Sequence, residues 1–239
     1  MQADPLCGLC RRAAQPFQRI VAYGAYEERL RDLIHVLKYQ GVRSAAPLLA
    51  RLLFQAVEQA GLPESLVVVP VPLYGNKLRG RGFNQSEEIA RALVRSYGSH
   101  EVRLNTSLLV RVRDTSSQTG LTRPQRRQNL RGAFAAPKPQ GIQDRSILLV
   151  DDVVTTGATV AECARTLLGA GAKEVFVATV ARAVRESELR LEGIGPYADI
   201  SLIGQSSGGL NIDSGGRLES ALPAGVVFHG RPAAETLST

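Results

Sequence analysis

The chain has 239 residues, of which 44% are hydrophobic and 21% are charged, and its formal net charge at pH 7 is +7. This length and composition are typical of a globular protein with one main domain, and they exclude a fibrous or wholly disordered chain. No apolar run approaches the roughly 20 residues of a membrane span, and the N-terminus lacks a secretory signal pattern, so we expect a cytoplasmic protein without a membrane span.

The positive charge is concentrated in the first three quarters of the chain. Residues 183–239 hold four Arg and seven Asp or Glu, a net charge of −3, which leaves +10 for the residues before them. A positive surface of that size attracts polyanions. Charge alone does not distinguish a small multiphosphate from a nucleic-acid backbone.

Apolar periodicity predicts two packed helices before residue 62. Their inward faces are Leu30, Leu33, Ile34 and Leu37 in the first, and Leu48, Leu49, Leu52, Leu53 and Ala56 in the second, which Gly61 closes. The continuous apolar run 66–69 then predicts a strand buried on both faces of a parallel sheet, ended by Pro70 and Pro72. After it we expect a glycine-rich basic loop.

A helix should follow that loop, because Asn84 with Glu87 three positions later is a typical N-terminal capping pattern. Its inward residues are Ile89, Ala90, Leu93, Val94 and Tyr97. Residues 111–131 have no apolar period and are rich in Arg, Gln, Ser and Thr, which predicts a mobile, solvated loop.

The next elements predicted are a strand over Ser146–Val150, a helix over Thr159–Leu168 and a strand over Glu174–Val180. The segment 183–239 holds nine of the 23 glycines and shows no clear period, so we treat it as a glycine-rich tail of unknown structure. Strands alternating with helices predict an α/β fold, with a mostly parallel sheet flanked by helices.

The segment Ile147–Thr159 carries the chemistry: an apolar strand, two acids and a small-residue loop that leads into a helix. A helix N-terminus favours a phosphate through its free backbone N–H groups and positive dipole end, and Gly157 permits close approach. Asp151 and Asp152 can accept from two neighbouring sugar hydroxyls and help to hold Mg²⁺. The alternative is a solvated turn in which Thr155 or Thr156 merely caps the helix.

The full string resembles the signature of the type I phosphoribosyltransferases. The resemblance implies that Asp151 and Asp152, the catalytic acids, bind the ribose of 5-phosphoribosyl-1-pyrophosphate together with Mg²⁺. It also implies that the loop binds the 5-phosphate through Thr155, Thr156, Gly157, Ala158 and Thr159. The 6-oxopurine salvage members have an acidic residue where this chain has Thr155, so hypoxanthine and guanine are disfavoured as substrates.

Three further stretches resemble the ComF competence-protein family within that superfamily. They are Leu37–Gly41, the run from Val69 through Gln85, and a loop containing Arg111, Gln118, Leu121, Arg126, Asn129, Leu130 and Gly132-Ala133-Phe134. The resemblance extends from about Cys7 to Arg182. It implies a role in DNA uptake during natural transformation, and partners that include single-stranded DNA or DNA-processing proteins.

The basic segments can supply the pyrophosphate half of such a site, because the leaving group carries several negative charges. The candidates are Val71, Pro72, Lys77, Arg79 and Arg81 after the first predicted strand, and Arg111, Arg113, Arg126 and Arg131 on a loop that can fold over the substrate. For each basic residue taken singly, a solvated surface position is an equally good interpretation.

Cys7 and Cys10 make half of a zinc site, since a structural zinc ion takes four ligands. ComF-type proteins often begin with a zinc ribbon built from two such pairs, so residues 1–22 resemble its remnant and we expect no tightly bound zinc. Residues 23–182 form the predicted phosphoribosyltransferase domain, with a helical hood at its N-terminus. Cys163 is predicted to pack inside the domain.

Two functions are compatible with this sequence. The first is a Mg²⁺-dependent phosphoribosyltransferase with an unidentified acceptor. The second is a non-catalytic module that senses phosphoribosyl pyrophosphate while its basic surface binds single-stranded DNA or a partner protein. The oligomeric state is open, and a homodimer is one option.

Overall fold

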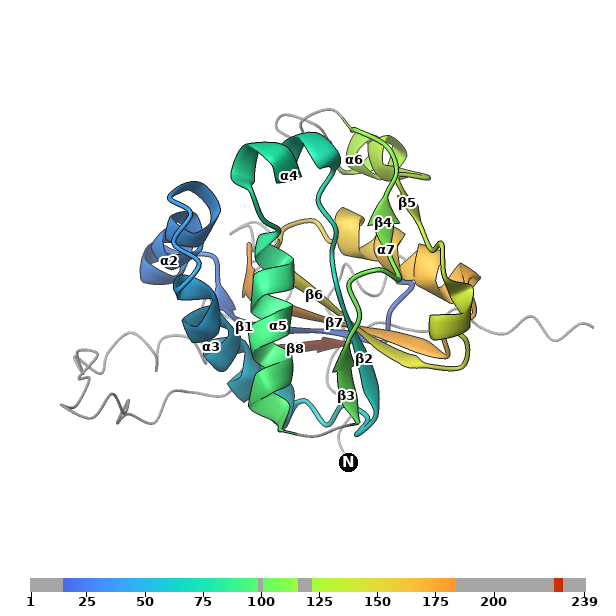
Figure 1. Ribbon diagram of the computed structural model, residues 1–239, viewed down its shortest axis with the longest axis horizontal. Coiled ribbons are helices and arrows are strands. Elements are labelled where there is room, and N and C mark those ends of the chain that lie inside the picture. Colours follow the sequence, from blue (N-terminus) through green and yellow to red (C-terminus); the bar gives the residue numbers. More distant parts are fainter. Residues whose placement is uncertain (1–14, 99–100, 116–121, 184–225, 230–239) are drawn as a thin grey trace, which may run out of the picture. The chain divides into compact units, whose positions relative to one another are not determined.

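The computed structural model describes residues 15–98, 101–115, 122–183 and 226–229. Its central sheet has the strand order β3-β2-β6-β7-β1-β8, in which β8 pairs antiparallel and the other described strands pair parallel (Figure 1). The strands are β1 Arg19–Ala25, β2 Leu66–Pro70, β3 Val102–Leu104, β6 Ser146–Val154, β7 Glu174–Arg182 and β8 Val226–His229. The α/β fold with a mostly parallel sheet is confirmed.

Helices cover both faces of this sheet. They are α2 Glu28–Tyr39, α3 Ala45–Gln59, α4 Gly75–Arg81, α5 Gln85–Tyr97, α6 Arg123–Leu130 and α7 Ala158–Gly169, with a 3₁₀ turn at Pro139–Gly141. In β6, Leu148 and Val150 pack in a cluster with α3 and α5, whereas Ile147 and Leu149 pack in a cluster with α7. Because successive side chains of a strand point to opposite faces, a continuous apolar run was the expected pattern for this strand.

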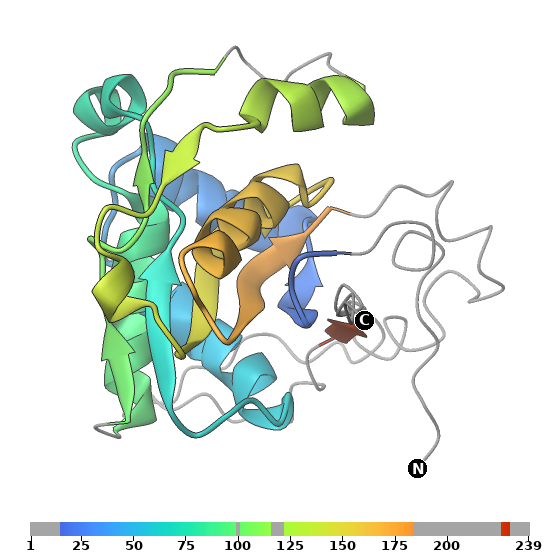
Figure 2. The ribbon, with the colours of Figure 1, turned by 90° about the vertical axis from the view of Figure 1, so that its right-hand side faces the viewer.

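A small antiparallel hairpin lies on the α7 side. Its strands are β4 Val110–Arg111 and β5 Phe134–Ala135, and α6 lies in the connection between them. Figure 2 shows α6 lying above α7. The predicted loop over 111–131 is therefore wrong for Arg123–Leu130, which form α6, whereas 112–115 lie in no helix or strand and 116–121 lie outside the described ranges. Thr122 and Gln125 form a capping box at the start of α6, which explains how this segment forms a helix although it has no apolar periodicity.

Two other local predictions need correction. The strand predicted to end at Val150 continues to Val154, because β7 pairs with it as far as Arg182, so Asp151 and Asp152 lie within β6 rather than after it. The predicted basic loop after Pro72 contains α4, which ends at Gly82 in the left-handed conformation, with φ 79°. The helix predicted after Asn84 is confirmed, and Asn84 caps it by accepting from the Ser86 backbone N–H at 3.1 Å.

Besides the two hairpin strands, three strands of the central sheet were not predicted. β1 lies between β7 and β8, and β3 lies at the other edge of the sheet beside β2. β8 falls within the segment 183–239 and pairs with β1, while residues 184–225 and 230–239 lie outside the described ranges. Among the described residues, no helix is long and apolar enough to cross a bilayer.

Candidate functional site

The paired acids lie near the carboxyl end of β6, at the edge of the sheet where β2 also ends. Pro70 of β2 is in register with Val150, and the Val71 backbone N–H donates to the Val150 carbonyl at 2.9 Å. Both acids are buried, with 9% of Asp151 and 4% of Asp152 exposed. Carboxylates placed this deeply require partners to offset the loss of hydration.

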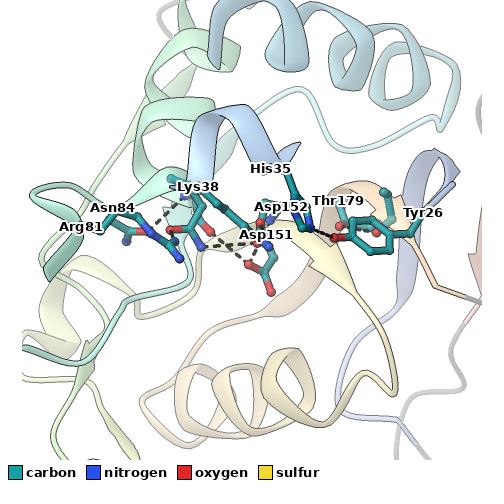
Figure 3. A network of polar contacts seen from close by, with 11 residues as sticks. Tyr26, His35, Lys38, Arg81, Asn84, Asp151, Asp152 and Thr179 are labelled. Carbon is teal, nitrogen blue, oxygen red and sulfur yellow. Dashed lines mark hydrogen bonds and ion pairs between the residues drawn. The ribbon is translucent and has the colours of Figure 1, made fainter. Parts of the chain in front are cut away.

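The two carboxylates have different partners. Asp151 Oδ1 accepts from the Ser86 hydroxyl at 3.0 Å and from the Asp152 backbone N–H at 3.0 Å. Asp152 Oδ1 lies 3.5 Å from Gln85 Nε2, and its Oδ2 forms an ion pair with Lys38 of α2 (Figure 3). Apart from that ion pair, Oδ2 has no hydrogen-bond partner among the described residues. The start of α5 and the end of α2 thus converge on the acids.

The alternation of β6 separates the acids between the two faces of the sheet. By this alternation Asp152 follows Leu148 and Val150, which pack with α2, α3 and α5, and Asp151 follows Ile147 and Leu149, which pack with α7. Asp151 lies near enough to the end of the strand that Ser86 at the start of α5 also reaches it. Accordingly, Asp151 lines a small cavity with residues 153–160, and Asp152 does not. Asp151 therefore belongs to the phosphate-loop side of the site and Asp152 to the α2 side.

Burial and charge raise the pKa of Asp151 to about 8. Loss of hydration is the main cause and the neighbouring charge of Asp152 adds to it, while Lys38 and the Ser86 hydrogen bond act in the opposite direction. The pKa of Lys38 is raised: burial favours its neutral form, but attraction to Asp152 and the bond to it outweigh that effect. Asp151 can therefore exchange a proton near neutral pH, whereas Lys38 stays charged.

The predicted phosphate loop lies between β6 and α7. Gly157 has φ 74° and precedes the first residue of α7, and the Thr156 hydroxyl accepts from the Ala158 backbone N–H at 3.4 Å. Thr155 is exposed, while Thr156 and Thr159 are half-buried. Because the first turn of a helix leaves backbone N–H groups without intrahelical acceptors, this loop is suited to an anion.

The basic residues after β2 divide into two groups. Arg81 donates to Gln85 Oε1, and Gln85 in turn lies beside Asp152, so Arg81 joins the network around the acids. Lys77 and Arg79 are exposed on α4, where the Arg79 guanidinium donates to Asn76 Oδ1 of the same helix. Val71 is buried, and its carbonyl accepts from Asn84 Nδ2 at 3.0 Å; Pro72 beside it is half-buried.

The arginines of the hairpin region also differ from one another. Arg111 is half-buried beside the Phe134 ring, 5.5 Å from its centroid, and its Nε is buried without a hydrogen-bond partner in the described structure. Burial lowers the pKa of Arg111, and the nearby acids Asp114 and Asp151 oppose that shift. Arg113 instead donates to the carbonyls of Asn129 at 2.9 Å and Arg131 at 2.7 Å. These bonds satisfy carbonyls at the C-terminal end of α6. The Arg126 side chain is half-buried and that of Arg131 is exposed.

Sequence reasoning missed four polar residues of this region. They are Lys38, Gln85 and Ser86 around the acids, and Glu162 of α7, which accepts from the Gly132 backbone N–H at 2.8 Å. A usable signal existed for two of them, since Gln85 and Ser86 directly follow a capping Asn at the sheet edge that holds the acids. Lys38 comes from a helix whose docking position the sequence does not specify.

The acids suit a hard divalent cation, which prefers carboxylate oxygens, and Asp152 Oδ2 is held only by a charge contact. Within the described ranges, no cluster of three or more His, Cys, Asp or Glu is suited to hold a metal ion. A cation at the acids would therefore take further oxygens from substrate or water. Cys7 and Cys10 lie outside the described residues. Cys163 is buried in the core, as predicted.

Comparison with known proteins is consistent with this architecture. Residues 49–193 match the family model of the phosphoribosyl transferase domain. The chain is 39% identical over 175 residues to the DNA utilization protein YhgH of Salmonella typhi, covering 72% of this chain and 75% of that protein. It is 36% identical over 184 residues to Competence protein F of Haemophilus influenzae, covering 74% and 78%.

Among solved structures, phosphoribosylpyrophosphate synthetase from Mycobacterium smegmatis aligns with a TM-score of 0.37 and 19% identity, over 61% of this chain and 37% of that one. The family assignment rests on the domain model and the two sequence relatives, which cover most of the described fold. On that evidence, the chain belongs to the ComF family of phosphoribosyltransferase-domain proteins.

Proposed function

We propose that this protein binds 5-phosphoribosyl-1-pyrophosphate with Mg²⁺ and transfers the phosphoribosyl group to an acceptor. The observation that supports this most is the position of Asp151. It lines one small cavity together with the loop 153–160, so a carboxylate for a sugar and a helix N-terminus for a phosphate lie side by side. Ribose 5-phosphate has hydroxyls that can donate to the carboxylate and a phosphate that can accept from the helix N-terminus, in one small molecule.

In this proposal the residues orient a sugar and stabilise a departing anion. Asp151 and Asp152 accept from ribose hydroxyls, and the loop Thr155–Thr159 holds the 5-phosphate. Asp151 and Asp152 would help to hold Mg²⁺, which would supply positive charge that stabilises the departing pyrophosphate. Arg111 presents a buried N–H without a partner in the described structure, and Arg81 adds a second cation near the acids. No side-chain nucleophile is needed, because cleavage proceeds through an oxocarbenium-like state.

A role in handling DNA is a further part of the proposal. Support comes from the names of the two relatives, one a DNA utilization protein and the other a competence protein. The net charge of +7 favours a polyanionic partner. We place this activity in the cytoplasm, where nucleotides and imported single strands are available, and leave the acceptor open among nucleobases and amines.

A second candidate function is a non-catalytic module that senses phosphoribosyl pyrophosphate and binds single-stranded DNA or a partner protein. The ion pair of Lys38 with Asp152 favours it, because one of the two acids already holds a cation of the protein itself. Such a site can respond to a ligand without performing transfer.

Calorimetry with phosphoribosyl pyrophosphate and Mg²⁺ tests the shared part of both proposals. The double variant Asp151→Asn with Asp152→Asn should lose binding, whereas Asp32→Asn, an exposed acid of α2, should bind like the wild type. Unchanged binding by the double variant would contradict the proposal. Pyrophosphate release with a panel of nucleobases and amines then supports the enzyme, while steep salt-dependent DNA binding without release supports the module.

A further inference from the structure

Lys38 reaches the acids from outside Ile147–Thr159, and it lies in the stretch Leu37–Gly41 that resembles the ComF family. It is the second-last residue of α2, and its ammonium contacts Asp152 Oδ2. Only 16% of the Lys38 side chain and 5% of the Asp152 side chain are exposed, in contrast to a surface pair such as Arg31–Asp32, with 53% and 70% exposed. Ion pairs at this depth are weakly screened, and removing one partner leaves an uncompensated charge.

The end of α2 is held in place around this lysine. His35 Nε2 lies 3.1 Å from the Tyr26 hydroxyl, which follows β1 (Figure 3). On the other side, the guanidinium of Arg81 lies 5.6 Å from the Tyr39 ring centroid. The end of α2 that carries Lys38 thus contacts both the residue after β1 and the last residue of α4.

The formal charges of the pocket make Lys38 a competitor for metal ions. A divalent cation binds ionised carboxylates, so beside it Asp151 and Asp152 count as −2 and together with Lys38 as −1. An added divalent cation alone would then leave a buried charge of +1. Without the lysine the acids sum to −2, which a divalent cation neutralises. A cation that arrives already bound to a multiply charged phosphate brings its own compensation, and its oxygens offer the lysine a new partner.

We propose that Lys38 is a tethered cation that occupies the metal position on Asp152, so that a divalent cation enters only as its complex with the sugar pyrophosphate. Lys38 then turns from Asp152 to a phosphate oxygen of the ligand. It is a positioning and specificity residue that couples α2 to the state of the acids. This inference rests on the proposed function.

The test is the affinity for Mn²⁺ alone, measured by calorimetry and by the electron paramagnetic resonance of free Mn²⁺. Lys38→Met should bind Mn²⁺ at least about tenfold more tightly than the wild type, since a cation this close shifts carboxylate equilibria by one or more powers of ten. The matched control is Lys173→Met, which also removes one positive charge. Lys173 is exposed and directly precedes β7, at the amino-terminal ends of the parallel strands, so its loss should leave the Mn²⁺ affinity unchanged.

Lys38→Gln guards against misfolding of the methionine variant, because its amide can still donate to Asp152 while the charge is absent. It should show the same gain in Mn²⁺ affinity, with the wild-type circular dichroism spectrum. Equal or weaker Mn²⁺ binding by a folded Lys38→Gln protein overturns the inference.

A parallel titration with phosphoribosyl pyrophosphate present separates this inference from the proposed function. The advantage of the lysine variants over the wild type should shrink or reverse, because the ligand now supplies the compensating charge. If the wild type binds Mn²⁺ with the ligand and the variants show no gain without it, only the role of Lys38 is wrong. If the wild type binds neither metal nor ligand, the proposed function itself fails.

Discussion

The hydroxyl of Ser86 donates to Asp151 Oδ1 at 3.0 Å, across 65 positions of sequence. This bond joins the first turn of α5 to the carboxyl end of β6. It depends on the capping of α5 by Asn84, which fixes where the helix begins, and on the Asn84 amide bond to the Val71 carbonyl. The segment after β2 therefore positions the acid on β6.

Ser86→Ala should weaken the binding of phosphoribosyl pyrophosphate by about threefold to tenfold and destabilise the fold by about 1 kcal/mol. In the wild type the Ser86 hydrogen bond favours the ionised form of Asp151, so its removal should raise the pKa of Asp151 further. Calorimetry and urea unfolding measure the two effects. Ser96→Ala is the matched control on α5, because the Ser96 hydroxyl donates to the Ala92 carbonyl of its own helix at 3.3 Å, away from the acids. Equal effects of the two substitutions would remove the special role of Ser86.

The raised pKa of Asp151 predicts a dependence of stability on pH. An unfolded Asp loses its proton near pH 4, whereas Asp151 in the folded protein loses it near pH 8. Between these values the folded state binds more protons than the unfolded state, so this group makes the protein less stable as pH rises from about 4 to about 8.

Asp151→Asn should remove that contribution. Its free energy of unfolding should exceed that of the wild type at pH 8.5 by at least about 1 kcal/mol, with a much smaller difference at pH 5, since each unit of pKa shift corresponds to about 1.4 kcal/mol. Urea unfolding at a series of pH values measures this. Parallel curves for wild type and variant across the whole range would show that Asp151 is not the group responsible.

The sequence was informative where a local pattern decides the structure. The apolar run of β6, the capping Asn84 and the small-residue loop before α7 each specify their own conformation, so the positions of the acids and of the loop between β6 and α7 could be predicted. Lys38 could not be assigned, because its contact with Asp152 depends on how α2 docks against β1 and α4. β1 was missed because its sequence, Arg19–Ala25, has only a short apolar run. Arg19 begins the strand, and its second half contains the small residues Ala22 and Gly24 on either side of Tyr23.

The hairpin β4–β5 is attached to α7 through Glu162. Its carboxylate accepts from the Gly132 backbone N–H at 2.8 Å and from Arg165 at 2.8 and 3.0 Å, and only 8% of the residue is exposed. The hairpin carries Arg111, which we propose to bind pyrophosphate. Glu162 therefore connects the hairpin to α7, the helix that follows the proposed phosphate loop.

Glu162→Ala should therefore destabilise the fold by about 1 to 3 kcal/mol, because the Gly132 N–H loses a charged acceptor. Amide hydrogen exchange should speed up in the described parts of the hairpin, 110–115 and 122–135, more than in β6. Arg165→Ala, which breaks only a half-exposed ion pair, serves as control and should cost less than about 1 kcal/mol. Faster exchange confined to α7 would contradict a role for Glu162 in holding the hairpin.

Gly157→Ala isolates the contribution of the backbone to the phosphate loop. An added Cβ would meet no atom within 4 Å, but the φ of 74° is one that residues with a Cβ rarely adopt. The cost should therefore be strain alone, about 1 kcal/mol, and relief of that strain would move the N–H groups that we assign to the 5-phosphate.

Gly169→Ala is the matched control at the other end of α7: it also has open space and lacks a positive φ, so it should be neutral or stabilising. Ribose 5-phosphate should bind at least several times more weakly to Gly157→Ala and normally to Gly169→Ala, and equal affinities would exclude this loop as the phosphate site.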